Sequence, residues 1–134
     1  MDYKTLVMEQ AIKAMKLSYS PYSNFAVGAA VITKDGTIYQ GANIENAAYG
    51  VCMCGERNAI YNAYCHGESK DTIEALAIVA DSPTPCSPCG ACRQVISELL
   101  NPETKIYLLN LKGDIKETNP VELLPFAFNK DDLK

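Results

Sequence analysis

The sequence lacks the features that mark membrane-spanning, secreted and repetitive proteins. No apolar run in its 134 residues is long enough to span a bilayer. The N-terminus, Met1-Asp2-Tyr3-Lys4, has neither the charged head nor the apolar stretch of a signal peptide. The chain also contains no repeat, no low-complexity stretch and no linker. We therefore expect one domain over residues 1–134, located in the cytoplasm and without a membrane partner.

A basic cluster is also missing, and the overall charge is negative. Twelve lysines and arginines stand against 16 acidic residues, which gives a net charge of -4 and a pI of about 4.9. Because an acidic surface repels phosphate backbones, this balance argues against a nucleic-acid partner. A small neutral substrate is compatible with it, whereas a nucleotide would lack a basic cluster to bind its phosphate.

Hydrophobic periodicity and turn residues predict alternating strands and helices. A helix is expected over residues 3–17, with Met8, Ala11, Ile12 and Met15 on one face. Residues 73–80 are nearly all apolar, as is typical of a strand covered on both faces. The other expected elements are strands at 26–33, 37–40, 106–109 and 115–117 and helices at 57–64, 89–100 and 121–124. The strand–helix–strand order over 73–109 favours a parallel pair with a right-handed crossover, in a mixed sheet with helices on both faces.

Cysteine is the residue type that carries most of the chemistry. Six cysteines stand at positions 52, 54, 65, 86, 89 and 92. In a reducing compartment, clustered thiols indicate metal ligands or redox groups. Cys89 and Cys92 are three apart at the start of a predicted helix, so both thiolates face one side and reach one ion. Taken alone, the pair fits a redox site or half of a structural zinc site equally well.

A thiol and a carboxylate two residues apart, Cys54 and Glu56, precede another predicted helix. Zinc deaminases carry His or Cys, then Glu two residues on, followed by Pro-Cys-x-x-Cys, and this chain fits that signature. Three ligands, Cys54, Cys89 and Cys92, leave zinc a fourth position for a water whose pKa the metal lowers. Glu56 is then the expected catalytic residue, which accepts and returns the proton of that water.

The segment His66-Gly67-Glu68 spells the same His-x-Glu pattern. A polar turn follows Glu68, whereas a helical pattern follows Glu56 and would hold its carboxylate, so we prefer Cys54 to His66 as the ligand. Three thiolates over-compensate the charge of zinc and weaken it as a Lewis acid. Both helix N-termini and Arg57, as a hydrogen-bond donor to a thiolate, are expected to offset that charge.

The sequence as a whole resembles the small, homotetrameric, zinc-dependent cytidine deaminases. Five segments carry the resemblance: residues 19–30, 41–49, 54–57, 87–94 and 122–125. The resemblance implies an α/β fold of three α/β/α layers around a five-stranded mixed sheet, with one zinc ion per chain. It implies hydrolytic deamination of cytidine and deoxycytidine to uridine and deoxyuridine, a reaction of pyrimidine salvage.

The same resemblance implies substrate contacts. Asn43 and Glu45 would bind the ribose 3′-hydroxyl, which suits an amide and a carboxylate because a hydroxyl both donates and accepts. The backbone N–H of Gly55 would meet the pyrimidine O2, and Phe25 would pack against the base. Phe128 would reach the site of a neighbouring subunit, so that the active sites lie at subunit interfaces.

Two positions depart from the family pattern, and two other functions stay open. Gly55 stands where alanine is usual, and Phe126 stands where a small residue is common. One alternative function is deamination of another aminopyrimidine nucleoside, such as an antibiotic. The other is a non-catalytic zinc module, in which Cys86 or Cys52 supplies a fourth thiolate and closes the metal site.

Overall fold

The computed structural model describes residues 1–133, which form a five-stranded sheet in the order β2-β1-β3-β4-β5. The strands are β1 (Val27–Thr33), β2 (Ile38–Ala42), β3 (Ile73–Ala80), β4 (Lys105–Asn110) and β5 (Ile115–Thr118). The helices are α1 (Tyr3–Ala14), α2 (Gly55–Cys65), α3 (Gly90–Leu99) and α4 (Pro120–Leu123), with 3-10 turns η1 (Met15–Leu17), η2 (Tyr49–Val51) and η3 (Lys130–Leu133). Every strand and helix expected from the sequence is present, with ends that differ by up to three residues; the largest difference is at α1, whose expected last turn is the 3-10 turn η1. None of the helices in residues 1–133 has both the length and the apolar character needed to cross a membrane.

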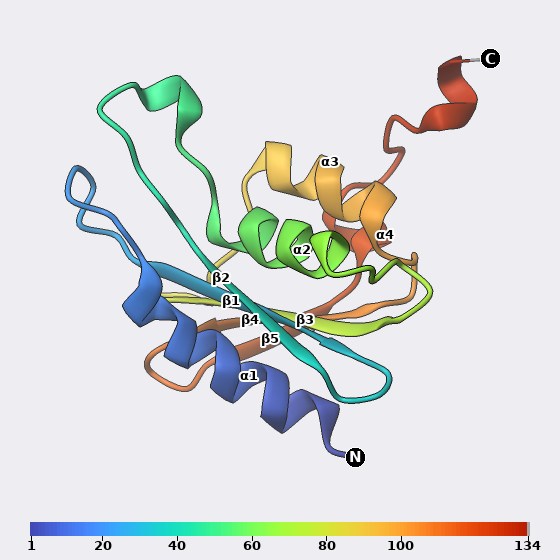
Figure 1. Cartoon of the computed structure of the whole chain (residues 1–134), viewed down its shortest axis with the longest axis horizontal. Helices are drawn as coiled ribbons and strands as arrows, with labels where there is room; N and C mark the ends of the chain where they lie inside the picture. Colours follow the sequence, from blue (N-terminus) through green and yellow to red (C-terminus); the bar gives the residue numbers. More distant parts are fainter. Residues whose placement is uncertain (134) are drawn as a thin grey trace.

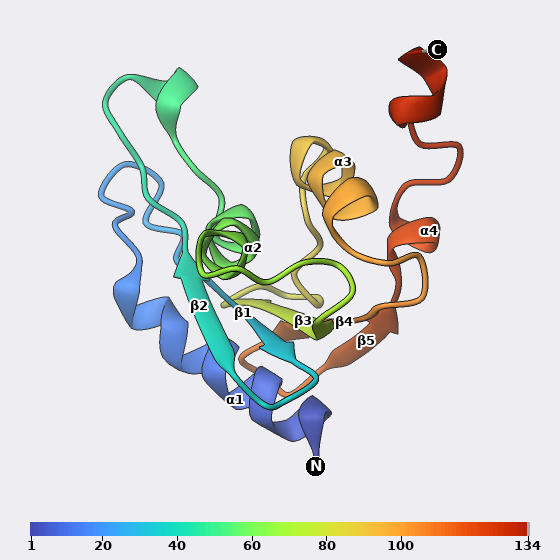
Figure 2. The same cartoon turned by 45° about the vertical axis from the view of Figure 1, so that its right-hand side comes forward.

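The helices cover the two faces of the sheet in separate layers (Figure 1). Helix α1 packs on one face, where Val7 and Ala11 are buried against strand residues that include Ile32 and Val79. Helices α2 and α3 lie side by side on the other face (Figure 2), over a larger core. The expected three-layer α/β/α arrangement with a mixed sheet is therefore confirmed.

The buried face of α1 differs from the expected one. Val7, Ala11 and Ala14 are buried, whereas the side chain of Ile12 is 45% exposed. The cause is the close approach of the helix to Gly28 of β1, where an added Cβ would lie 2.2 Å from the carbonyl oxygen of Ala11. A helix this close to a strand backbone buries its small side chains and turns Ile12 outward.

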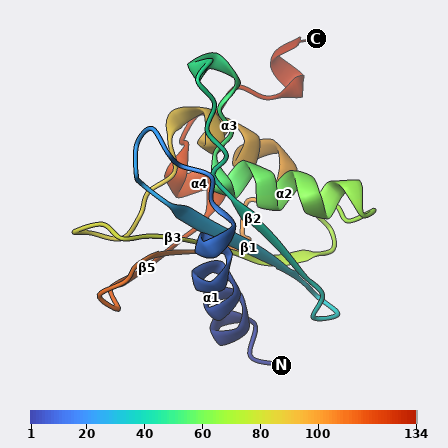
Figure 3. The same ribbon diagram turned by 60° about the vertical axis from the view of Figure 1, so that its left-hand side comes forward.

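The strand directions bring two helix N-termini to the same edge of the sheet. Strand β1 is antiparallel to both β2 and β3, so β2 and β3 run in the same direction. Helix α2 follows β2 and helix α3 follows β3, so both helices begin beyond the carboxyl ends of these strands. Strands β3 and β4 are parallel and α3 lies between them in the chain, which confirms the expected parallel pair. The loop containing η2 and the loop over residues 18–24 project from the same region of the molecule (Figure 3).

Helix α2 begins two residues before the expected start at Arg57. It also lies directly on the backbone of β2, because an added Cβ at Gly41 would be 2.2 Å from the nitrogen of Ala59. The early start places Glu56 in the first turn of the helix, with Cys54 as its N-cap residue. The signature residues are therefore fixed by a helix that is packed tightly against the sheet.

Candidate metal centre and active site

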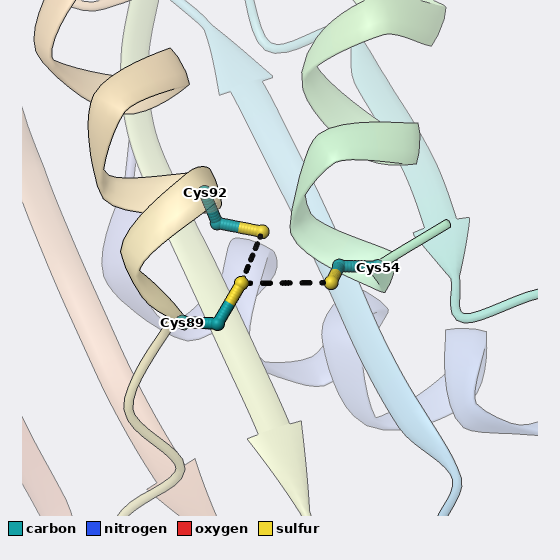
Figure 4. Close-up of side chains that lie close together, drawn as sticks. All are labelled: Cys54, Cys89 and Cys92. Atoms are coloured by element: carbon teal, nitrogen blue, oxygen red, sulfur yellow. Dashed lines mark hydrogen bonds between the residues drawn. The ribbon is translucent and has the colours of Figure 1, made fainter. Parts of the chain in front are cut away.

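Three thiols from two helix N-termini point toward one another (Figure 4). Cys54 is the N-cap residue of α2, Cys89 is the N-cap residue of α3, and Cys92 lies in the first turn of α3. The Sγ of Cys89 is 3.8 Å from that of Cys54 and 3.5 Å from that of Cys92. All three sulfur atoms lie within 4.8 Å of one another. The topology thus joins residues that are 35 positions apart in the sequence.

The three sulfur atoms have the spacing that a zinc ion needs. Tetrahedral zinc holds thiolate sulfur at ~2.3 Å, which places two such sulfur atoms about 3.8 Å apart. Within residues 1–133, no other histidine, cysteine or carboxylate completes this group of three. Neither Cys52 nor Cys86 joins the cluster, so a closed site of four thiolates does not form in this part of the chain. The cluster fits one zinc ion per chain with a ligand position left for water.

Hydrogen bonds and helix ends stabilise negative charge at the cluster. The pKa of Cys54 is lowered to about 5, chiefly because the Cys92 thiol donates a hydrogen bond to it and secondly because of Arg57. The Nη2 atom of Arg57 donates to the Sγ of Cys54 over 3.5 Å. Neither N-cap thiol accepts a capping hydrogen bond, so the first N–H groups of both helices remain available to stabilise thiolate charge.

Glu56 lies beside the cluster and is almost completely buried from solvent. Its side chain is 4% exposed, yet it lines the same cavity as Cys54 and Cys89. Burial raises the pKa of the carboxyl group, because removal from water disfavours the charged form. A carboxyl group with a raised pKa is suited to accept a proton and to return it within one reaction cycle.

His66 lies outside this arrangement. It is the C-cap residue of α2, at the end opposite Cys54, and its Nδ1 is 2.8 Å from the carbonyl oxygen of Asn62. Glu68 accepts a hydrogen bond from the hydroxyl of Tyr39 over 2.7 Å. The alternative His-x-Glu segment is therefore engaged in local contacts at the far end of the helix.

A cavity of about 510 Å³ opens onto the thiol cluster. Its walls contain Phe25, Asn43, Glu45 and Gly55, the residues expected to contact substrate within one subunit. An added Cβ at Gly55 would come within 3.0 Å of the carbonyl oxygen of Val27, so the glycine allows α2 to start close to β1. Phe128 does not line this cavity but a second one, near α3 and α4.

Nearly all of the hydrogen-bonding capacity of the Asn43 side-chain amide is used within the protein. Its Oδ1 accepts hydrogen bonds from the N–H of Val27 at 2.9 Å and from the hydroxyl of Ser18 at 2.5 Å. Its Nδ2 donates to the carbonyl oxygen of Phe25 over 2.7 Å. One N–H of the amide is left for a ligand, so Asn43 offers a donor and no acceptor.

The carboxylate of Glu45 offers the opposite polarity. It accepts hydrogen bonds from the N–H groups of Tyr22 and Ser23 and from the hydroxyl of Ser23. These donors lower the pKa of Glu45, with the Ser23 side chain as the largest cause. A charged carboxylate is an acceptor only. Asn43 and Glu45 together therefore match a group that accepts one hydrogen bond and donates another, as a hydroxyl does.

Several cavity residues were not singled out by the sequence analysis. Tyr22 and Tyr49 meet edge to face across the cavity loops, with ring centroids 6.3 Å apart. Ser23 also lines the cavity, as do Cys52 and Cys86, which the sequence had offered only as a fourth ligand of a closed zinc site. Tyr22, Ser23 and Tyr49 lie within the segments that resemble known deaminases. Polar or aromatic side chains in predicted loops of those segments were the sequence signal that could have identified them as cavity residues.

Comparisons with known proteins agree with this geometry. Residues 1–108 match the family described as the cytidine and deoxycytidylate deaminase zinc-binding region. The chain belongs to this family. It is 53% identical over 133 residues to the cytidine deaminase of Sporosarcina psychrophila, covering 99% of this chain and 96% of that relative. The cytidine deaminase of Halalkalibacterium halodurans is 52% identical over 133 residues, covering 99% of this chain and 98% of that relative.

The fold of a solved cytidine deaminase is also closely similar. The crystal structure of the cytidine deaminase from Burkholderia pseudomallei gives a TM-score of 0.90 at 44% identity, covering 93% of this chain and 98% of that one. Membership of a family described as a zinc-binding region agrees with a cluster of three thiols beside the cavity that Glu56 lines.

Proposed function

We propose that residues 1–134 form one deaminase domain that hydrolyses cytidine and deoxycytidine to uridine and deoxyuridine, with release of ammonia, as in pyrimidine salvage. One observation carries the proposal: the buried carboxyl group of Glu56 lines the same cavity as Cys54 and Cys89, whose thiols form one cluster with that of Cys92. Relatives that are 53% and 52% identical over nearly the whole chain bear the name cytidine deaminase.

The chemistry divides between the metal and Glu56. Zinc held by Cys54, Cys89 and Cys92 supplies, when bound, a Lewis acid that makes water nucleophilic near neutral pH. Glu56 accepts a proton from the attacking water and delivers it to N3 of the cytosine ring, while the water oxygen bonds to C4. Glu56 then takes the remaining hydroxyl proton and passes it to the amino group. The C4–N bond breaks, and ammonia leaves.

The protein's own residues orient the nucleoside. The N–H of Gly55 meets the pyrimidine O2, and the ring of Phe25 packs on the base. The free N–H of Asn43 donates to the 3′-hydroxyl, whose hydrogen is accepted by Glu45. These contacts leave the 2′ position unspecified, so both sugars are accepted. Within the described chain, none of the residues lining the cavity is Lys, Arg or His, which disfavours a substrate with a 5′-phosphate.

We also propose that the enzyme acts as a cytoplasmic homotetramer, with Phe128 of one subunit beside the base bound by another. Two observations support this: the Phe128 side chain is 56% exposed, and it does not line the cavity of its own subunit. A mixing experiment tests it. Subunits with Phe128→Ala and subunits with Glu56→Gln, dissociated and reassembled together, should recover activity that neither variant has alone.

An ultraviolet assay with cytidine, deoxycytidine, cytosine, CMP and adenosine, run side by side, tests the proposed activity. We expect both nucleosides of cytosine to be converted and the other three compounds to remain. A zinc-loaded protein inactive on all five would favour the non-catalytic zinc module. Preferential conversion of a different aminopyrimidine nucleoside in a competition assay would favour the other alternative.

A further inference from the structure

We infer that Ser23 is a positioning residue of the substrate cavity, whose hydroxyl holds the Glu45 carboxylate and the Phe25 backbone as one unit. The inference rests on the proposed function, because it assigns Ser23 a task in binding the sugar hydroxyl. In the described chain, none of the hydrogen bonds of Ser23 reaches the thiol cluster or Glu56.

The direction of the Ser23 hydrogen bonds is fixed by the chemistry of its partners. The N–H of Phe25 donates to the Ser23 Oγ over 3.0 Å, so the oxygen acts there as an acceptor. Glu45 is a carboxylate and cannot donate, so the hydroxyl hydrogen of Ser23 points to its Oε2. A continuous chain of donors and acceptors thus runs from the Phe25 backbone through Ser23 to Glu45.

The two oxygens of Glu45 have different tasks. Oε1 accepts the N–H of Tyr22 at 2.9 Å and the N–H of Ser23 at 3.1 Å, which uses both of its lone pairs. Oε2 accepts only the Ser23 hydroxyl among the described residues, so one lone pair remains for a ligand. The oxygen available to a sugar hydroxyl is therefore the one that Ser23 orients.

The same network reaches the donor side of the subsite. The carbonyl oxygen of Phe25 accepts a hydrogen bond from the Nδ2 of Asn43 at 2.7 Å. Ser23, Phe25, Asn43 and Glu45 are thus joined in one set of contacts at the wall of the cavity. Ser23 itself is exposed, so its hydroxyl contributes more to the orientation of these groups than to the buried core.

Kinetics of Ser23→Ala and Ser23→Thr on two substrates test the inference. Cytidine carries the 3′-hydroxyl, and 3′-deoxycytidine does not. Ser69→Ala is the matched control, because the Ser69 Oγ also accepts the N–H two residues on, that of Asp71 at 3.2 Å, and lies outside the cavity. Each variant is assayed with its full zinc content, and kcat and KM are determined separately.

We expect Ser23→Ala to lower kcat/KM for cytidine about tenfold, mainly through KM, because a hydrogen bond to a charged group is lost. For 3′-deoxycytidine the change in kcat/KM should stay below about twofold, since this substrate has no 3′-hydroxyl to donate a hydrogen bond to Glu45. Ser23→Thr, which keeps the hydroxyl, should restore cytidine kinetics, and Ser69→Ala should match the unmodified enzyme.

An equal loss on both substrates would overturn the inference, because Ser23 would then be merely structural. Unchanged cytidine kinetics in Ser23→Ala would overturn it as well. Both results require an active unmodified enzyme, and they would leave the proposed function intact. An unmodified enzyme inactive on cytidine would instead overturn the proposed function.

Discussion

The guanidinium of Arg57 donates a hydrogen bond from Nη2 to the Sγ of Cys54, one turn back along α2, at 3.5 Å. This hydrogen bond would draw charge from the Cys54 thiolate, so that a zinc ion held there would be a stronger Lewis acid. We expect Arg57→Gln to lower kcat of the zinc-loaded enzyme about 10- to 100-fold, the usual effect of removing a partner of a metal ligand. Steady-state kinetics with the zinc content determined on the same sample measure this. Unchanged kcat would show that Arg57 contributes packing alone and has no effect on the thiolate.

Replacement of Glu56 by glutamine should separate turnover from binding. The amide keeps the shape of the carboxyl group but cannot accept a proton. General acid–base groups typically contribute about 10²–10⁴-fold, and Glu56 serves several proton transfers, so kcat should fall by about 10⁴-fold or more. Zinc content and cytidine binding, measured by metal analysis and calorimetry, should remain near normal. Loss of zinc would make Glu56 a ligand, and retained activity would exclude it as the proton shuttle.

Removal of one thiol should distinguish ligands from the other cysteines. We expect Cys54→Ala, Cys89→Ala and Cys92→Ala each to abolish activity and zinc binding, because the two remaining thiolates would lose the ion to other ligands in solution. Serine at Cys52, Cys65 or Cys86 should leave one zinc per chain. His66→Ala serves as a further control and should also keep the metal. Zinc loss in Cys86→Ser as complete as in Cys89→Ala would refute the ligand assignment.

Phe126 adopts a backbone conformation that favours glycine. Its φ is 56°, in the left-handed region, and its side chain is fully exposed. Phe126→Gly should therefore raise the free energy of unfolding by about 1 kcal/mol, since conformational strain is relieved and no intramolecular contact is lost. Denaturant unfolding measures the change. Asn24→Gly, at the same φ, is the matched control and should gain less, because asparagine tolerates this region.

Gly41 should not tolerate a side chain. An added Cβ would lie 2.2 Å from the nitrogen of Ala59 and 2.7 Å from the carbonyl oxygen of Gly55. We expect Gly41→Ala to lower the free energy of unfolding by about 3 kcal/mol, because helix α2 must move off the sheet. Gly50→Ala is the control, since nothing lies within 4 Å of an added Cβ there. Equal stability of the two variants would contradict the tight packing of α2 on β2.

The sequence was most informative where a pattern depends on neighbouring residues. The apolar run at 73–80 predicted β3 with its observed ends, and the spacing of Cys89 and Cys92 placed both thiols on one turn of α3. The buried face of α1 was predicted wrongly at Ile12, because the contact that decides it comes from Gly28 on another element. Periodicity reports which residues share a face, but not how closely a strand approaches it.

The Ser23 network escaped prediction for a similar reason. Its partners lie on two loops that only the folded chain brings together. Tyr19 joins these loops, because its N–H donates to the carbonyl oxygen of Asn43 at 3.0 Å and its own carbonyl accepts from the N–H of Glu45 at 2.8 Å. No local spacing in the sequence encodes such a contact, whereas the motifs around Cys54 and Cys89 are short and contiguous.

The position of β1 between β2 and β3 has a consequence for how folding and zinc binding are coupled. In the described sheet the strands that precede α2 and α3 do not pair with each other, so the position of Cys54 beside Cys89 depends on the pairing of β1 on both sides. One of those pairings joins Val27 to Ala80, distant in sequence, and such contacts form slowly because a long loop must close first. Because these long-range pairings hold the three thiols together, we expect zinc to bind the folded chain more tightly than the unfolded one, so that zinc raises the free energy of unfolding.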